Sequence, residues 1–285
     1  GFRDVEATSQ GVSLAGKALA LRGVTRNECD GRTGLAVNIP DMLDDIEVFD
    51  IKARSVRPVW ITVSIPADTP AGEYASTVKV YAKGRQLRTF DIGLTVIGRE
   101  LPPPAEWNYY LDLWQHPAAV ARVEGLDLWS DAHFEALVPY MRLLADAGQK
   151  VVTTTLNKDP WNNQCFDAYA DMIVWTKNAD GSWSYDYTVF DRWVELMTGL
   201  GIDRTINCYS MLPWNNELHY RDGSTGRFVD VTADPGTPAF EALWEPFLTD
   251  FTGHLREKGW LERTNIAMDE RSPEEMTDAL GLLRK

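Results

Sequence analysis

Thr264-Asn-Ile-Ala-Met-Asp-Glu-Arg-Ser-Pro-Glu-Glu275 is the stretch from which the fold of the C-terminal part is predicted. Its apolar run, residues 266–268, predicts the end of a strand. Ser272 then occupies an N-cap position, Pro273 the first helical turn, and Glu275 the third position after the cap. That combination is a capping-box signature, so a helix is expected to begin directly after the strand.

Two adjacent carboxylates, Asp269 and Glu270, fall between this strand and this helix. In α/β folds, catalytic residues collect where strands end and loops begin. Two carboxylates at such an edge indicate acid/base chemistry on a polar substrate. We therefore predict that Asp269 and Glu270 are the catalytic residues.

Strand and helix patterns alternate through the residues before this stretch. We predict strands at residues 107–113, 151–156 and 204–209, and helices at residues 131–147, 190–200 and 238–255. With the strand and helix described above, these elements make four β/α units in succession. Such alternation indicates a parallel sheet with crossover helices, either doubly wound or closed into a barrel.

Long connections follow the second and third of these strands, at residues 157–186 and 211–236. Each is expected to contain a hairpin, with turns at residues 178–181 and 222–226. The loops carry amide and aromatic side chains toward the edge that holds the two carboxylates, and indole rings stack well on sugar faces. We predict a carbohydrate site whose substrate-binding residues are Trp114, Asn157, Trp161, Trp214, Asn215 and Tyr220.

The N-terminal residues have the pattern of an all-β domain. Alternating apolar positions predict strands at residues 58–65, 74–81 and 87–97, with turn residues between them. A small β-sandwich that supports the rest of the chain fits this pattern. The predicted organisation is a sandwich over residues 1–99, a Pro-rich linker at 100–105, and a catalytic domain over 106–285.

Composition excludes several classes of function. Residues 1–98 contain 12 acidic and 12 basic residues, so the net charge of −14 falls on residues 99–285. Such a surface repels phosphate backbones, and we expect no nucleic-acid partner. No apolar run approaches the roughly 20 residues of a membrane span.

Metal and disulfide sites are not expected either. The four histidines, His116, His133, His219 and His254, form no close pair, and the three cysteines, Cys29, Cys165 and Cys208, lack metal-like spacing. We predict no metal and no cofactor, and interpret the cysteines as free thiols.

Five motifs in this order resemble glycoside hydrolase family 123. They are Asn38-Ile-Pro-Asp-Met-Leu43, Arg57-Pro-Val-Trp60, Pro66-Ala-Asp-Thr-Pro-Ala-Gly-Glu-Tyr74, Leu101-Pro102 and Met268-Asp269-Glu270. The resemblance implies a β-sandwich ahead of a (β/α)8 barrel, and a retaining, exo-acting β-N-acetylgalactosaminidase without a cofactor. It also implies a secreted, periplasmic or cell-surface location.

The resemblance further implies a substrate-assisted mechanism, in which the 2-acetamido oxygen of the sugar is the nucleophile. Glu270 would protonate the departing glycosidic oxygen and later activate water. Asp269 would hold the acetamido N–H and stabilise the cyclic intermediate.

The chain departs from this pattern in length. Residues 106–285 hold four β/α units, whereas a barrel needs eight strands and about 250 residues. We therefore expect a truncated barrel that is weakly active or inactive unless a second copy or a missing C-terminal half completes it. Two alternatives are a glycosidase of other specificity and a non-catalytic carbohydrate-binding protein.

Overall fold

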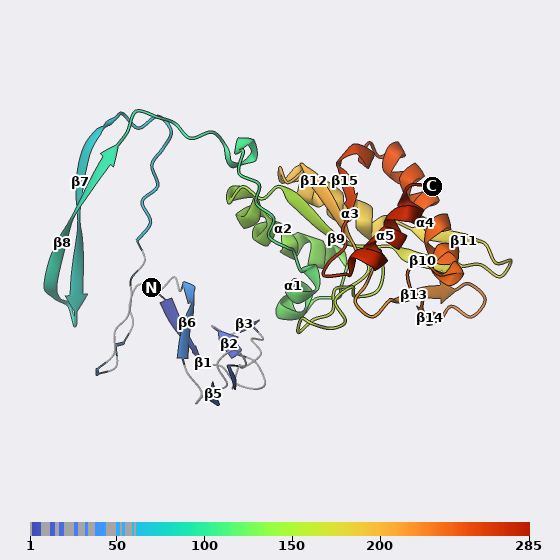
Figure 1. The fold of residues 1–285 in the computed structure, drawn as a ribbon. Coiled ribbons are helices and arrows are strands. Elements are labelled where there is room, and N and C mark those ends of the chain that lie inside the picture. The colour runs from blue at the N-terminus through green and yellow to red at the C-terminus, as the bar shows by residue number, and fades with distance from the viewer. Residues whose placement is uncertain are drawn as a thin grey trace. The chain divides into compact units, whose positions relative to one another are not determined.

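The chain forms two compact units, shown in Figure 1. One consists of Gly1–Val5 and Ile39–Pro103, and the other of Glu6–Asn38 and Pro104–Lys285. The computed structural model describes residues 50–51, 53–54, 59 and 61–285 in full, and only the backbone of residues 2–6, 12–14, 17–19, 26–27, 32–33 and 38–43. None of the helices in these ranges is long and apolar enough to cross a membrane.

The strands before residue 100 pair two by two. The pairs are β1 (Phe2–Glu6) with β6 (Asn38–Leu43), β2 (Val12–Leu14) with β3 (Lys17–Leu19), β4 (Arg26–Asn27) with β5 (Arg32–Thr33), and β7 (Gly72–Ala82) with β8 (Arg85–Val96). The β7–β8 pair is the antiparallel hairpin predicted from residues 74–97. Its turn places Lys83 and Gly84 at positive φ, 51° and 73°.

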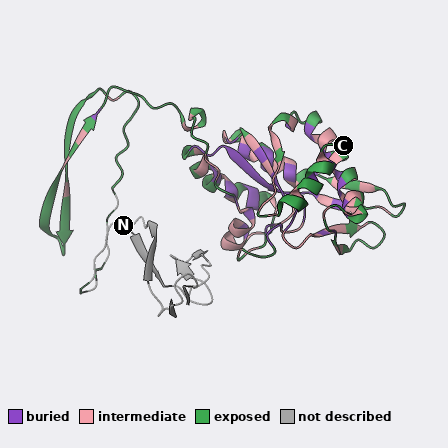
Figure 2. Ribbon diagram, viewed as in Figure 1, coloured by how far each residue is buried: buried purple, intermediate pink, exposed green. Residues whose placement is uncertain are grey.

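The prediction of an N-terminal β-sandwich is wrong for the residues that the structure describes. A sandwich needs two sheets with a buried layer between them. Here every described sheet before residue 100 has two strands, and Val96 is the one buried residue of β7 and β8. Figure 2 shows this hairpin as exposed along most of its length. The strand predicted at 58–65 does not form at residues 59 and 61–65, the described part of that range, because alternation alone does not specify a strand.

The C-terminal unit is built on a parallel sheet with strand order β15-β12-β9. Its strands are β9 (Val151–Thr155), β12 (Thr205–Tyr209) and β15 (Thr264–Ile266). Its helices are α1 (Pro117–Glu124), α2 (Asp131–Asp146), α3 (Thr188–Gly199), α4 (Pro238–Glu257) and α5 (Pro273–Leu283), with short 3-10 turns η1 (Pro104–Glu106) and η2 (Leu261–Arg263). The strand predicted at 107–113 is reduced to one parallel bridge between Leu111 and Gln149.

The predicted (β/α)8-type barrel is wrong, also in its truncated form with about four β/α units. The described parallel sheet has three strands and is open, so no closed ring of strands forms. The hairpins that follow β9 and β12 join into a separate sheet of order β11-β10-β13-β14. Its strands are β10 (Val174–Lys177), β11 (Trp183–Asp186), β13 (Glu217–Asp222) and β14 (Phe228–Thr232). Closure into a barrel requires continuous pairing around the ring, and these strands do not provide it.

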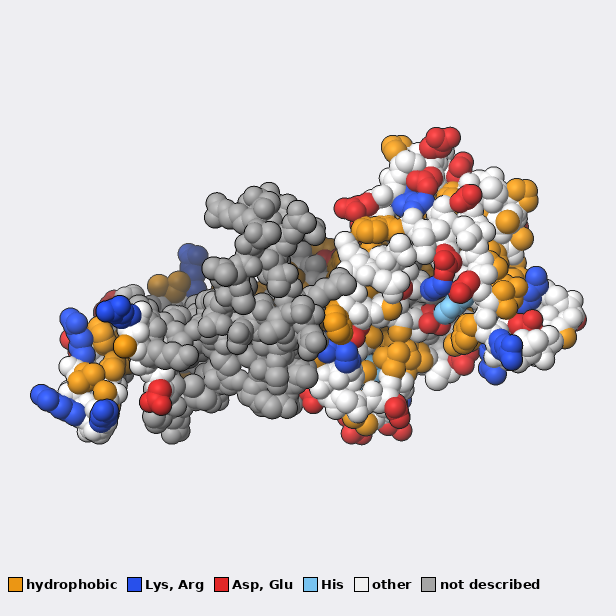
Figure 3. Space-filling model, turned by 90° about the horizontal axis from the view of Figure 1, so that it is seen from below, with side chains coloured by type: hydrophobic (Ala, Val, Ile, Leu, Met, Phe, Trp, Pro, Cys, Tyr) orange, Lys and Arg blue, Asp and Glu red, His pale blue; other side chains and the backbone are white. Residues whose placement is uncertain are grey.

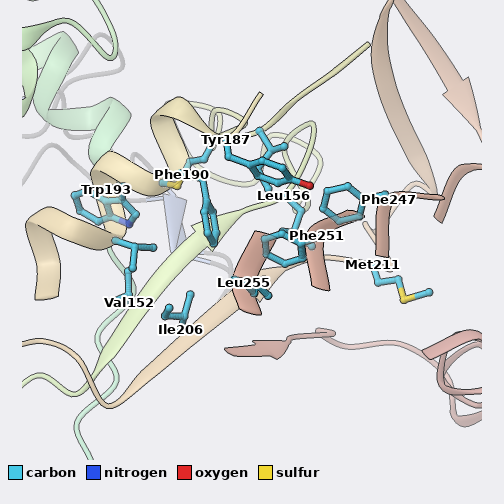
Figure 4. Packing of buried hydrophobic residues seen from close by; sticks show 14 of the residues in the cluster. Val152, Leu156, Tyr187, Phe190, Trp193, Ile206, Met211, Phe247, Phe251 and Leu255 are labelled. Carbon is cyan, nitrogen blue, oxygen red and sulfur yellow. The ribbon is translucent and has the colours of Figure 1, made fainter. Parts of the chain in front are cut away.

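A single large hydrophobic core joins one face of the parallel sheet to the helices. Helix α4, predicted at residues 238–255, buries Phe240, Trp244, Phe247, Phe251 and Leu255 in this core. Figure 4 shows Phe247, Phe251 and Leu255 near Phe190 of α3 and Ile206 of β12. Alternate residues of β12, such as Ile206 and Cys208, face this core. Asn207 and Tyr209 therefore lie on the opposite face, where the site is built.

Candidate active site

Asp269 is held in place by a tryptophan from a distant loop. Sheet pairing continues past β15, since Ala267 N–H donates to the Cys208 carbonyl at 2.9 Å, and Asp269 follows two residues later. The indole Nε1–H of Trp161 donates to Asp269 Oδ2 at 2.8 Å. Trp161 lies in the loop after β9 and is only 2% exposed. The bond therefore fixes the carboxylate by a group that has little freedom to move.

Aromatic rings surround the Trp161 indole. The ring of Trp114 lies 5.0 Å away at an interplanar angle of 30°, Tyr169 lies at 4.5 Å and Tyr209 at 4.9 Å. Trp114 keeps 43% of its surface exposed, and the other three rings are buried. An exposed indole beside an anchored carboxylate offers an apolar face and an acceptor together, which is the combination that a sugar ring requires.

Glu270 has different surroundings from Asp269. It is exposed and its backbone has φ 51°, in the left-handed region that side chains other than glycine seldom adopt. The predicted capping box directly after it is confirmed: Ser272 Oγ accepts from Glu275 N–H, and the Glu275 carboxylate accepts from Ser272 N–H. Helix α5 thus begins immediately after the carboxylate pair and restricts the backbone on that side.

Arg271 connects the carboxylate pair to the loop after β12. Its Nη1 donates to the carbonyls of Pro213 at 3.1 Å and Trp214 at 2.9 Å, and its Nη2 donates to Asn216 Oδ1 at 2.8 Å and to Glu275. Its side chain is only 9% exposed. The loop that carries Trp214 is therefore fixed to the residue next to Glu270.

A polar row lies on the face of the sheet opposite the core. Asn265 Nδ2 donates to Asn207 Oδ1 at 3.3 Å, and Asn207 Nδ2 lies 3.5 Å from Asp112 Oδ2. Burial raises the pKa of Asp112 above its ordinary value. Burial, with the nearby carboxylates of Asp112 and Asp269, raises the pKa of Tyr209 to about 12. Tyr209 is therefore a protonated phenol at neutral pH and can donate a hydrogen bond.

The structure brings together four of the six residues predicted to bind substrate: Trp114, Trp161, Trp214 and Asn215. Trp114 and Trp214 pack around Trp161, which binds Asp269. Asn215 is next to them, with its Nδ2 at 3.4 Å from Asn162 Oδ1.

The other two predicted binding residues, Asn157 and Tyr220, have contacts in the four-stranded sheet. The amide of buried Asn157 is engaged by the backbone of His219 in β13, to which it donates at 3.0 Å and from which it accepts at 2.8 Å. Tyr220 packs edge-on against Trp183 of the four-stranded sheet, with ring centroids 5.3 Å apart. Both side chains therefore contact residues of the four-stranded sheet.

Sequence reasoning missed Tyr169, Tyr209, Asp112 and Arg271. Tyr209 is the final residue of a strand that the sequence predicts. Its position at the carboxyl edge of the parallel sheet, near the predicted site, could therefore have been predicted. Asp112 lies near the end of the predicted strand 107–113 and carries a similar signal, whereas Tyr169 and Arg271 carry none. Tyr169 lies in a long loop, and Arg271 acts through carbonyl groups of a loop about 57 residues away.

The histidines and cysteines occupy separate environments. The His116 ring contacts the Asp167 carbonyl, His133 that of Pro117, His219 the Asp171 carboxylate and His254 the Asp191 carboxylate. Cys165 and Cys208 are free, and Cys29 lies outside the described residues. In the part of the chain that the structure describes, no group of three or more His, Cys, Asp or Glu is placed to hold a metal ion.

Comparison with known proteins places this site in a family. Residues 114–285 match the glycoside hydrolase 123 catalytic domain, and residues 25–82 match the glycoside hydrolase 123 N-terminal domain. No curated protein sequence gives a match.

A similar solved structure is described as showing "the details of glycolipid glycan hydrolysis" by a family 123 glycoside hydrolase from Clostridium perfringens. The two chains are 33% identical with a TM-score of 0.72, over 76% of this chain and 39% of that one. The present chain thus spans less than half the length of that relative. Because the catalytic-domain match alone covers more than half of the sequence, the chain belongs to glycoside hydrolase family 123.

Proposed function

We propose that the protein is a retaining exo-glycoside hydrolase that releases terminal β-linked N-acetylhexosamine, with N-acetylgalactosamine as the favoured sugar, by substrate-assisted catalysis. Family membership supports hydrolysis of a glycosidic bond. The relative from Clostridium perfringens acts on glycolipid glycans, which supports a glycan substrate.

The observation that carries the mechanism is the hydrogen bond from Trp161 to Asp269 Oδ2. Since the indole occupies one carboxylate oxygen, Asp269 Oδ1 is the oxygen that would accept the acetamido N–H of the sugar. That bond would turn the acetamido carbonyl oxygen toward the anomeric carbon. The negative charge of Asp269 would also stabilise the positive charge that develops on the acetamido group as its oxygen attacks.

Glu270 would carry the proton. In the first step the acetamido oxygen forms a bond to the anomeric carbon, the glycosidic C–O bond breaks, and Glu270 gives its proton to the departing oxygen. In the second step Glu270 takes a proton from water as that water attacks the anomeric carbon and reopens the ring. Two inversions at one carbon give overall retention. The exposure of Glu270 suits a group that meets both leaving group and water.

Chromophore release from aryl glycosides tests the proposal. We expect cleavage of the β-N-acetylgalactosaminide, weak in these 285 residues alone and stronger where a second copy or a longer chain completes the site. The N-acetylglucosaminide should be cleaved less efficiently, and the plain β-galactoside should stay intact. Glu270→Gln should abolish release, because the amide can neither give nor take the proton.

The other outcomes assign other functions. Cleavage of the plain galactoside would indicate a glycosidase with a conventional enzyme nucleophile. Binding of the sugars without release, unchanged by Glu270→Gln, would indicate a carbohydrate-binding protein. Either result would contradict the proposal.

A further inference from the structure

Trp161, whose indole binds Asp269, lies in a loop without regular secondary structure. The loop joins β9, which ends at Thr155, to β10, which begins at Val174, and all of its residues are described by the structure. Side chains on loops are held less precisely than those on helices and strands unless further contacts fix them. The orientation of the Asp269 carboxylate therefore depends on what fixes this loop.

Arg122, in the last turn of α1, holds the middle of the loop. Its Nε donates to both carboxylate oxygens of Asp167, at 2.7 and 2.9 Å, and its guanidinium carbon lies 4.8 Å from the centroid of the Phe166 ring. The Asp167 side chain is only 16% exposed, so water screens this ion pair less than it would screen a pair on the open surface. Arg122 thus attaches two consecutive loop residues to a helix.

His116, at the start of α1, contacts the same part of the loop. Its Nε2 donates to the carbonyl of Asp167 at 2.8 Å, and its ring centroid lies 3.9 Å from that of Tyr169. Helix α1 therefore binds Asp167 through both the side chain and the main chain. The His116 ring extends this contact to Tyr169, two residues further along.

These contacts form a continuous series from Arg122 to Asp269. Arg122 holds Asp167, Tyr169 packs 4.5 Å from Trp161, and Trp161 donates to Asp269. Tyr169 and Trp161 are 9% and 2% exposed, and such closely packed rings transmit a displacement rather than absorb it. A hydrogen bond weakens steeply as its geometry departs from linear, and a shift of about 1 Å at a catalytic group can lower a rate by about a hundredfold.

We propose that Arg122 is a positioning residue for the acetamido-assisted reaction. By holding Asp167, it keeps Tyr169 and Trp161 in contact and so keeps the Asp269 carboxylate in the orientation that receives the acetamido N–H. The inference rests on the proposed function for its effect on hydrolysis. Its effect on the bond between Trp161 and Asp269 can be measured without a substrate.

The indole N–H signal of Trp161 in a proton–nitrogen correlation NMR spectrum provides that measurement. The signal is identified by its absence from the Trp161→Phe spectrum. We expect Arg122→Gln to shift it toward the position of an indole N–H without a hydrogen bond and to speed its exchange with solvent, because Gln lacks both the charge and the Nε donor. Asp167→Asn removes the charge from the other partner and should give the same result if Arg122→Gln does not fold.

Arg192 of α3 provides a matched control. Its Nη1 lies 2.7 Å from Asp131 Oδ1, and its guanidinium carbon lies 4.0 Å from the centroid of the Phe134 ring. Arg192 therefore has the same two kinds of contact as Arg122. Arg192→Gln should leave both the Trp161 signal and hydrolysis unchanged. An unmoved signal in Arg122→Gln, or an equal shift in the Arg122 and Arg192 variants, would overturn the proposal.

Hydrolysis of the aryl β-N-acetylgalactosaminide measures the consequence for catalysis. We expect Arg122→Gln to lower kcat/KM by about three- to tenfold, less than Trp161→Phe, because the bond to Asp269 is weakened rather than removed. Since both changes act on one bond, adding Arg122→Gln to Trp161→Phe should lower kcat/KM by less than about twofold further. If the two losses multiply in the double variant, Arg122 does not act through Trp161 and the proposal is wrong.

Failure of the inference differs from failure of the proposed function. If the unsubstituted protein hydrolyses the aryl glycoside and Arg122→Gln is equally active, the inference is contradicted and the proposed function stands. If no N-acetylhexosaminide is hydrolysed although the Trp161 signal moves in Arg122→Gln, the proposed function is contradicted. The structural link between Arg122 and Asp269 would stand in that case, but its assigned role in hydrolysis would not.

Discussion

Asp269 and Glu270 are adjacent in the sequence but have different surroundings. One accepts a hydrogen bond from buried Trp161, whereas the other is exposed at a left-handed backbone position. A held carboxylate suits a fixed electrostatic role, and an exposed one suits proton exchange with leaving group and water. The difference in surroundings therefore agrees with the division of roles proposed above.

Removing the indole donor should weaken catalysis while the ring packing is kept. We expect Trp161→Phe to lower kcat/KM on the aryl N-acetylgalactosaminide by about ten- to a hundredfold, since a hydrogen bond to a charged group contributes about 1.5–3 kcal/mol. Trp183→Phe, on the β10–β11 hairpin, is the matched control and should retain activity. Unchanged kcat/KM for Trp161→Phe would show that the Asp269 contact is not used in catalysis.

Loss of the Arg271 side chain should destabilise the unit. Arg271→Met leaves two carbonyls, Asn216 and Glu275 without their donor in a nearly buried position. We expect the free energy of unfolding to fall by about 2–4 kcal/mol, measured by urea denaturation. Arg256→Met, at an exposed position of α4, should change it little. Equal stability of the two variants would contradict the role given to Arg271.

The position of Asp269 and Glu270 between a strand and a helix is easier to predict from the sequence than the groups that hold these carboxylates. Asp269 and Glu270 follow from a local strand–turn–helix pattern of a dozen residues. Their partners do not, because Trp161 lies 108 residues from Asp269 and no local rule joins them. Asn157 shows the same limit: its place at a strand end suggests binding, and no local pattern predicts the hydrogen bonds between its amide and the backbone of His219 in β13.

At the level of elements, α5 depends on a charged capping box. Bonds from the Ser272 hydroxyl and N–H, with the Arg271 guanidinium, hold the pKa of Glu275 below its ordinary value of 4.5. The ionised form is therefore stabilised by folding. Its contribution to stability is fully present above about pH 4.5 and is lost as the pH falls through the lowered pKa.

Comparing Glu275→Gln with the unsubstituted protein measures this contribution. We expect the variant to have a lower free energy of unfolding than the unsubstituted protein at pH 7, measured by urea denaturation. This difference should shrink as the pH falls below about 4.5. Glu274→Gln removes a neighbouring exposed carboxylate outside the capping box and should show no such gap. If the loss of stability in Glu275→Gln did not depend on pH, the folded protein would not stabilise the ionised form of Glu275.

Elements with a clear hydrophobic periodicity are predicted well. Elements that form only through pairing with residues far away in the sequence are not. Helices α2, α3, α4 and α5 form close to their expected positions, because each has an apolar face that the core buries. Helix α1 is missed, since eight residues with only two buried give a weak pattern. The segment 107–113 has strand-like composition but pairs only at Leu111.

For the whole molecule, the alternation of strands and helices predicts a parallel sheet but not its closure. The order β15-β12-β9 is parallel as expected, and yet it stays open within the described residues. Net charge is also a property of the whole molecule. Figure 3 shows several Asp and Glu groups on one face of the C-terminal unit, in agreement with the net charge of −14. A neutral glycan meets no repulsion there, unlike a nucleic acid.

The central claim is that the acetamido group of the substrate, placed by Asp269, is the nucleophile. The most direct measurement is kcat/KM for aryl β-galactosaminides whose N-acetyl group carries zero, one, two or three fluorine atoms. Each fluorine withdraws electron density from the carbonyl oxygen and makes it a weaker nucleophile. We predict a progressive and steep fall in kcat/KM along the series. Rates independent of fluorine content would contradict the account and indicate a nucleophile supplied by the protein.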